Sequence, residues 1–154
     1  MSLAHPPTRT VGRIVAELQS LRLPVAVGGS ALLASLGLVT HVRDWDVTSE
    51  GEPAEVTSAL DRLGLAWSAS PAPERPFATR ARFVVDADDH EIDVLVGFAA
   101  WDRDEVVPLP VHVTGTWLGL PIADPEVWAR AYRLIGRAER AELLDAWLRG
   151  DRAR

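Results

Sequence analysis

The chain has 154 residues, of which 47% are hydrophobic, so it is long enough to form one domain with a buried core. Its formal net charge of -6 and isoelectric point of 5.2 argue against a protein that coats nucleic acid through the phosphates. The absence of cysteine excludes disulfides and thiolate metal sites. All 16 basic residues are arginines, so any role that lysine commonly has falls to arginine.

The N-terminal segment lacks the charged start and the apolar run of a signal peptide. No uninterrupted apolar stretch is long enough to cross a bilayer. These features predict a soluble cytoplasmic protein with no membrane partner. The acidic balance also predicts no extended nucleic-acid footprint, although contact with a short RNA end would need only a few arginines.

The first part of the chain alternates helical and strand patterns. Apolar residues recur at helical spacing from Thr8 until Pro24 ends the pattern. A buried strand, a Gly28-Gly29 turn and a helix of small residues follow, with Gly37 as the expected stop. The elements predicted after the first helix are a strand at 25–27, a helix at 30–38, a strand at 45–48, a helix at 54–63 and a short strand at 66–68.

Turns and prolines dominate the middle of the chain. Residues 68–76 hold three prolines in nine residues and predict an irregular loop, a candidate lip over a site. A hairpin is expected from strands at 83–85 and 92–96, and its turn carries solvated aspartates. Residues 106–113, which two prolines interrupt, predict an edge or irregular strand, and Trp101 and Trp117 are expected in loops.

The last part of the chain predicts two helices, at 125–135 and 138–148, because Asp124 and Pro125 form a typical helix start. The whole pattern predicts an α/β (α+β) fold with a mixed sheet flanked by helices. We expect a single domain over 1–154, with a core at about 8–115 and a C-terminal helical pair at about 124–150.

Residues 27–47 combine a Gly-Gly-Ser turn, which precedes a helix, with an Asp-x-Asp pair. Side chains alternate along an extended strand, so Asp44 and Asp46 point to the same face, about 7 Å apart. Such a pair suits a magnesium ion, and backbone N–H groups at a helix start suit phosphate. This one segment therefore predicts both parts of a nucleotide site.

A third carboxylate, Asp93, lies in an otherwise apolar strand. Ile92, Val94 and Val96 occupy the opposite face of that strand. A buried carboxylate is costly unless it is paired or bound to metal, so we expect Asp93 beside the strand that carries Asp46.

The order of these residues resembles the nucleotidyltransferase superfamily of the polymerase-beta type, particularly its minimal and antitoxin-like members. That family has a hydrophobic residue, Gly, and Gly or Ser, then a spacer and an Asp-hydrophobic-Asp/Glu-hydrophobic run. Here residues 27–30 read Val-Gly-Gly-Ser, and a spacer of thirteen residues, at the long end for the family, leads to Asp-Trp-Asp-Val at 44–47. The resemblance covers roughly residues 25–96 well and the C-terminal helices less well.

The resemblance implies a magnesium-dependent nucleotidyltransferase that moves a nucleoside monophosphate, AMP by default, from an NTP such as ATP to a hydroxyl. The acceptor could be a small molecule, a protein or an RNA end. Asp93 would help to deprotonate the acceptor, and Arg133 or Arg130 would stand where a lysine that contacts phosphate is usual. The implied residues are Asp44, Asp46 and Asp93 as catalytic ligands of two Mg²⁺ ions, and Gly28, Gly29, Ser30, Arg43 and Arg133 as contacts of the nucleotide.

Two other functions remain open on the sequence. Some superfamily members keep the fold but act as antitoxin-like partners of a helical toxin, and this chain could do so with weak or no catalysis. An Asp-x-Asp pair also occurs in metal-dependent glycosyltransferases, whose usual domain is larger than this chain.

Overall fold

The computed structural model describes residues 3–150, which form a mixed seven-stranded sheet, a separate two-stranded sheet and five helices. The strand order in the large sheet is β3-β4-β5-β2-β1-β9-β8, with β2–β5 and β1–β9 parallel and the other pairs antiparallel. The helices are α1 (Arg9–Ser20), α2 (Gly29–Ser35), α3 (Pro53–Arg62), α4 (Pro125–Leu134) and α5 (Ala138–Arg149). The strands are β1 (Val25–Gly28), β2 (Trp45–Ser49), β3 (Ala66–Ala69), β4 (Ala81–Asp86), β5 (Glu91–Val96), β6 (Ala99–Asp102), β7 (Glu105–Pro108), β8 (Val113–Trp117) and β9 (Leu120–Ala123).

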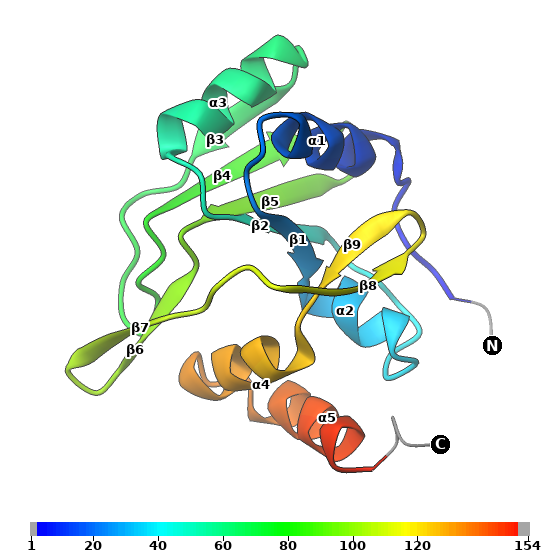
Figure 1. The fold of residues 1–154 in the computed structure, drawn as a ribbon, viewed down its shortest axis with the longest axis vertical. Coiled ribbons are helices and arrows are strands. Elements are labelled where there is room, and N and C mark those ends of the chain that lie inside the picture. Colours follow the sequence, from blue (N-terminus) through cyan, green and yellow to red (C-terminus); the bar gives the residue numbers. More distant parts are fainter. Residues whose placement is uncertain (1–2, 151–154) are drawn as a thin grey trace.

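Two pairs of helices lie at opposite ends of the long axis of the molecule (Figure 1). At one end α1 packs against α3, and at the other end α4 packs against α5. The apolar stripe of α1 is fully buried, and the indole N–H of Trp45 donates to the Pro7 carbonyl just before α1 (3.0 Å). The sheet face that carries Trp45 and Val47 is therefore a closed core, and the site must be on the other face.

Most predicted elements are confirmed, with ends shifted by one to three residues. The mixed α+β fold is confirmed as well, and the hairpin of β4 and β5 places its aspartates in an exposed turn. The helix predicted at 30–38 is shorter, because α2 ends at Ser35 and Gly37 adopts a left-handed backbone with φ +75°.

The structure differs from the prediction in parts of the segment between residues 99 and 123, although β7 falls on the first part of the edge strand expected at 106–113. The expectation that Trp101 and Trp117 lie in loops is overturned, because Trp101 belongs to β6 and Trp117 ends β8. The main sheet also runs on to Ala123, past the core boundary set near residue 115. These strands are only four or five residues long, so their length does not indicate a strand. The β8–β9 turn has Leu118 at φ 54°, a backbone conformation for which leucine gives no sequence signal.

In the described part of the chain, no helix is long and apolar enough to cross a membrane.

Candidate functional site

Three strands bring the main predicted residues into one row across the sheet. The antiparallel register of β1 and β2 pairs Gly28 with Asp46, and the parallel register of β2 and β5 pairs Asp46 with Asp93. The neighbouring residues Trp45 and Val94 are buried on the opposite face. The two carboxylates therefore share the sheet face that the α1 core does not cover, as the alternation of the strands predicted.

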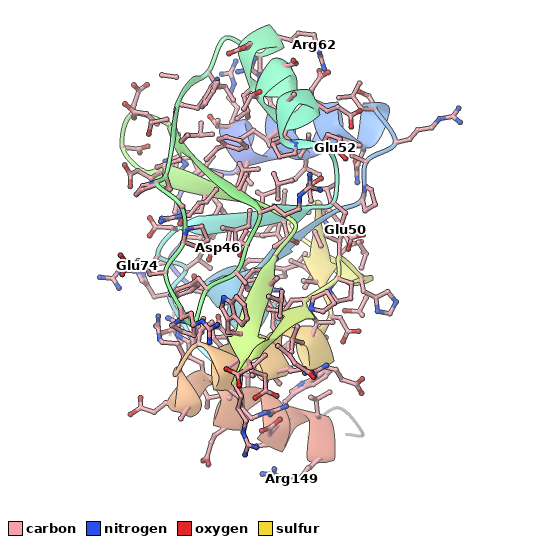
Figure 2. The ribbon with its side chains drawn as sticks, turned by 90° about the vertical axis from the view of Figure 1, so that its left-hand side faces the viewer. Asp46, Glu50, Glu52, Arg62, Glu74 and Arg149 are labelled. Atoms are coloured by element: carbon pink, nitrogen blue, oxygen red, sulfur yellow. The ribbon has the colours of Figure 1, made fainter. Side chains whose placement is uncertain are left out.

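Asp46 lies at the centre of this arrangement (Figure 2), about midway along the molecule between the two helical ends. Burial and, to a smaller extent, the negative charges of Asp93 and Asp44 together raise the pKa of its carboxyl to about 7, against the lowering effect of Arg82 and Arg140. A carboxyl group that its surroundings hold partly protonated near neutral pH is one that a cation would stabilise in its ionised form.

Asp44 is half-buried just before β2 begins, so it lies one residue outside the regular strand. Its charge nevertheless acts on Asp46. Over residues 3–150, no three acidic or histidine side chains are gathered closely enough to form a ready-made metal site. The donor set still fits magnesium, because it consists of hard carboxylate oxygens whose mutual repulsion a divalent cation would relieve. Asp93 would have to exchange its ion pair with Arg82 for the metal.

Asp93 has a cationic partner that the sequence analysis did not identify. Nη2 of Arg82 lies 2.9 Å from Oδ1 of Asp93, and Nε of Arg82 lies 3.3 Å from the same oxygen. Arg82 is on β4, two strands away from Asp46, and its side chain is half-exposed. Strand alternation could have indicated this partner, since Phe83 and Val85 face the core and Arg82 must face the other way.

The Gly-Gly turn lets the backbone at the start of α2 lie directly against the side chains of Asp46 and Trp128. Gly29 has φ +62°, and a Cβ atom there would collide with the Asp46 carboxylate. A Cβ atom on Gly28 would collide with the indole of Trp128, which α4 supplies. Both glycines are therefore required by their neighbours, and Gly29 holds the backbone of the α2 start directly against Asp46.

The other predicted contacts of the nucleotide are less well placed. Ser30 is buried, and its Oγ accepts a hydrogen bond of 3.3 Å from the backbone N–H of Arg43, whose own side chain is exposed. Nη1 of Arg133 lies 2.8 Å from Oδ2 of Asp145 on α5, and Arg130 is exposed on α4. Arg133 would have to leave Asp145 to meet a phosphate.

Two arginines of the C-terminal helices lie closer to the site than Arg133 or Arg130 does. Arg140 acts on the charge of Asp46 and donates a hydrogen bond of 3.3 Å to the hydroxyl of Tyr132. Arg137, at the start of α5, lines the same cavity as Asp46. The sequence placed a phosphate-binding arginine on the same pair of helices, at Arg133 or Arg130, and that assignment stays a prediction; Arg137 and Arg140 were not identified, because the packing of α5 on α4 is not visible in the sequence.

A cavity of about 760 Å³ opens on the carboxylate face and reaches both Asp46 and Asp93. That volume is typical of a small-molecule site. Its walls include the proline-rich loop after β3, the two strands β4 and β5, and Trp128 of α4. The loop predicted as a lip therefore does border the site, whereas Asp44 and the residues from Gly28 to Ser30 do not line this cavity.

The raised pKa of Asp46 predicts how the metal-free protein responds to pH. The folded-state pKa of about 7 exceeds the ordinary value of 3.8, so the folded state binds this proton more tightly. Stability should therefore fall as pH rises from about 4 to about 7, and the penalty should be complete above that range. Asp46→Asn removes the charge, so in chelator at about pH 8 this variant should melt at a higher temperature than wild type.

Thermal melts at about pH 4 and about pH 8 check this expectation, since the difference between variant and wild type should nearly vanish at the lower pH. Added magnesium should raise the melting temperature of wild type at the higher pH and have little effect on the variant. A variant that is less stable than wild type in chelator at about pH 8 would contradict the proposed electrostatic strain.

No protein-family profile and no curated protein sequence match this chain. Solved structures do resemble it. The chain is similar to a nucleotidyltransferase candidate from Thermotoga maritima, TM1012, with a TM-score of 0.66, 21% identity and coverage of 92% of this chain and 91% of that one.

It is also similar to the antibiotic-resistance factor ANT(2'')-Ia, whose solution structure gives a TM-score of 0.54 at 21% identity, covering 95% of this chain and 92% of that one. The crystal structure of ANT(2'')-Ia with adenylyl-2''-tobramycin gives a TM-score of 0.57 at 19% identity, with coverage of 95% and 91%. The chain therefore has the fold of the nucleotidyltransferases, as the sequence motif predicted.

Proposed function

We propose that this protein is a magnesium-dependent nucleotidyltransferase that moves a nucleoside monophosphate, AMP by default, from an NTP to a hydroxyl of an acceptor. The observation that carries the proposal is the row of Gly28, Asp46 and Asp93 across three neighbouring strands. Likeness of fold alone would not support an activity, because one fold can host many functions. The row adds two carboxylates on one face, next to a backbone turn that only glycine can form.

Asp44, Asp46 and Asp93 are the proposed ligands of two Mg²⁺ ions. When bound, magnesium would neutralise charge on the reacting phosphate and on the departing pyrophosphate. The repulsion that raises the pKa of Asp46 supports this assignment, because the same charges that disfavour the empty site favour a bound cation.

The phosphates of the nucleotide are proposed to meet the backbone at Gly28 and Gly29 and the hydroxyl of Ser30. Arg140 and Arg137 are better placed than Arg133 to balance the phosphate charge, since Arg140 already acts on Asp46. Arginine can bind phosphate oxygens in a bidentate manner, so the absence of lysine does not exclude this role.

In the proposed reaction, the bonds that form and break belong to the acceptor and the NTP, and Asp93 takes the released proton. The acceptor oxygen forms a bond to the α-phosphorus of the NTP, and the bond from that phosphorus to the bridging oxygen breaks. Pyrophosphate leaves with the electron pair, and Asp93 accepts the proton of the hydroxyl. Asp93 must separate from Arg82 before it can do so, and this is feasible because their ion pair is partly exposed and contributes little stability.

Calorimetry tests the first requirement of this function. We expect ATP to bind in the presence of magnesium and to bind much more weakly in chelator, because the carboxylates would otherwise repel the triphosphate. Titrations of the other triphosphates then show the preferred base. Absence of binding for every triphosphate, with and without magnesium, would contradict the proposal and favour the antitoxin-like alternative.

A further inference from the structure

The cavity on the carboxylate face is cationic, although the chain as a whole is acidic. Three arginines line the cavity, Arg80, Arg82 and Arg137, and its carboxylates are Asp46 and Asp93, all within the described chain. The proposed metal site would occupy both carboxylates. Arg137 is proposed above for the phosphates of the nucleotide, so Arg80 and Arg82 are the positive charges that remain for a second substrate, in a protein with a formal net charge of -6.

Arg80 is the arginine best placed to receive a second substrate. It lies two residues before Arg82, and both arginines line the cavity, where Arg82 pairs with Asp93 and the guanidinium of Arg80 turns to Glu52 just outside the lining. The stem of Arg80 lies across Gly97, where an added Cβ would stand only 2.9–3.1 Å from Cβ, Cγ and Cδ of Arg80. Gly97, at φ +66°, thus leaves the space that lets this side chain lie along the strand end.

The present partner of Arg80 is weakly held. Nη2 of Arg80 lies 3.0 Å from Oε2 of Glu52, and both side chains are more than half exposed. Exposed ion pairs of this kind contribute between about 0 and 1 kcal/mol, so a substrate anion that is better enclosed can replace Glu52. Arg82 pairs in the metal-free protein with Asp93, a residue of the proposed reaction, whereas the partner of Arg80 has no part in that reaction.

The rest of the cavity is mostly apolar and encloses a small volume. The proline-rich loop contributes Pro71 and Pro73, and Phe77 and Phe98 add aromatic surface. These side chains offer an ammonium group no hydrogen-bond acceptor and no negative charge, only the faces of the two aromatic rings. A polyamine such as tobramycin, the compound present as its adenylyl derivative in one ANT(2'')-Ia structure, would find carboxylates here only at the proposed metal ligands.

We propose that the acceptor is a small hydroxyl compound that carries a phosphate or carboxylate group, and that Arg80 binds this anionic group. The inference rests on the proposed function and names the class of its acceptor. The anionic group anchors the acceptor beside Asp93, and the separate hydroxyl receives the nucleoside monophosphate as described above. Arg80 is thus a residue that determines specificity, and it does not take part in the chemical step.

The test compares four probes by calorimetry with protein free of nucleotide: glycerol 3-phosphate, glycerate, glycerol and tobramycin. The two anions distinguish a phosphate from a carboxylate. We expect at least one of them to bind at least about tenfold more tightly than glycerol, and Arg80→Gln to remove this advantage. The matched control is Arg9→Gln, since Arg9 is an exposed arginine at the start of α1 and does not line the cavity.

Two outcomes would overturn the inference: failure of both anions to bind more tightly than glycerol, with or without binding of tobramycin, or anion binding that Arg80→Gln leaves unchanged. Titration of ATP with magnesium into the same variants separates this inference from the proposed function. If wild type binds the anion but not ATP, the proposed nucleotidyltransferase activity fails and the anion site at Arg80 stands. If Arg80→Gln loses ATP binding and anion binding equally, Arg80 belongs to the nucleotide site and the proposed acceptor site is overturned.

Discussion

Asp46→Asn is expected to weaken the magnesium-dependent binding of ATP by about a hundredfold or more and to abolish detectable nucleotidyl transfer. Asp46 is central because its carboxylate lies between Asp93 on the next strand and the Gly29 backbone at the start of α2. Asparagine preserves the shape against Gly29 but removes the negative charge. Calorimetry with ATP, in magnesium and in chelator, measures the effect directly.

The matched control is Asp102→Asn, the same change at an exposed position on the small sheet of β6 and β7. It should bind ATP as wild type does. The melting behaviour described above provides the second control, because Asp46→Asn should lose ATP binding without any loss of fold. Unchanged ATP affinity in a folded Asp46→Asn variant would place the metal site elsewhere in the protein.

The sequence was sufficient to place the carboxylates because strand alternation is a local property. Asp46 and Asp93 each interrupt an apolar strand at a position where the neighbours face the core, so their common face followed from the period of two. That the two strands are adjacent was an expectation from the cost of an unpaired buried carboxylate, and the register of β2 and β5 bears it out; their parallel direction was not predicted.

The arginines show what the sequence could not provide. Arg82 belongs to the site because β4 pairs with β5, and Arg80 because the backbone at Gly97 gives it room. Arg137 and Arg140 belong to it because α5 folds back on α4 and brings its first turn near Asp46. Each of these placements depends on tertiary packing between distant segments, and the resemblance that implied Arg133 carried no information on it.

The late strands were missed for a different reason. β9 pairs in parallel with β1 at the centre of the sheet, yet its four residues include Pro121, which weakens any strand prediction. Its partner β8 contains Gly115 at an irregular step of the register. Long-range pairing with β1 stabilises β9, and β9 in turn supports β8, so tertiary context overrides weak local preference.

Asp93→Asn is expected to separate binding from catalysis. The variant should bind ATP with magnesium to within about threefold of wild type, because Asp46 and Asp44 remain and the lost ion pair with Arg82 is partly exposed. Turnover should nevertheless fall by about a hundredfold or more, since asparagine cannot accept the proton of the acceptor hydroxyl. Pyrophosphate release from ATP, with water or an identified acceptor as the hydroxyl, measures the change.

Glu91→Gln is the matched control, because Glu91 lies two residues before Asp93 on the same face of β5 but is exposed at the end of the strand. It should leave both ATP binding and turnover unchanged. Retained turnover in Asp93→Asn would show that another group accepts the proton. Loss of ATP binding together with turnover would instead show that Asp93 is needed to hold the nucleotide. That result would contradict the proposal that Asp44 and Asp46 serve binding while Asp93 serves proton transfer.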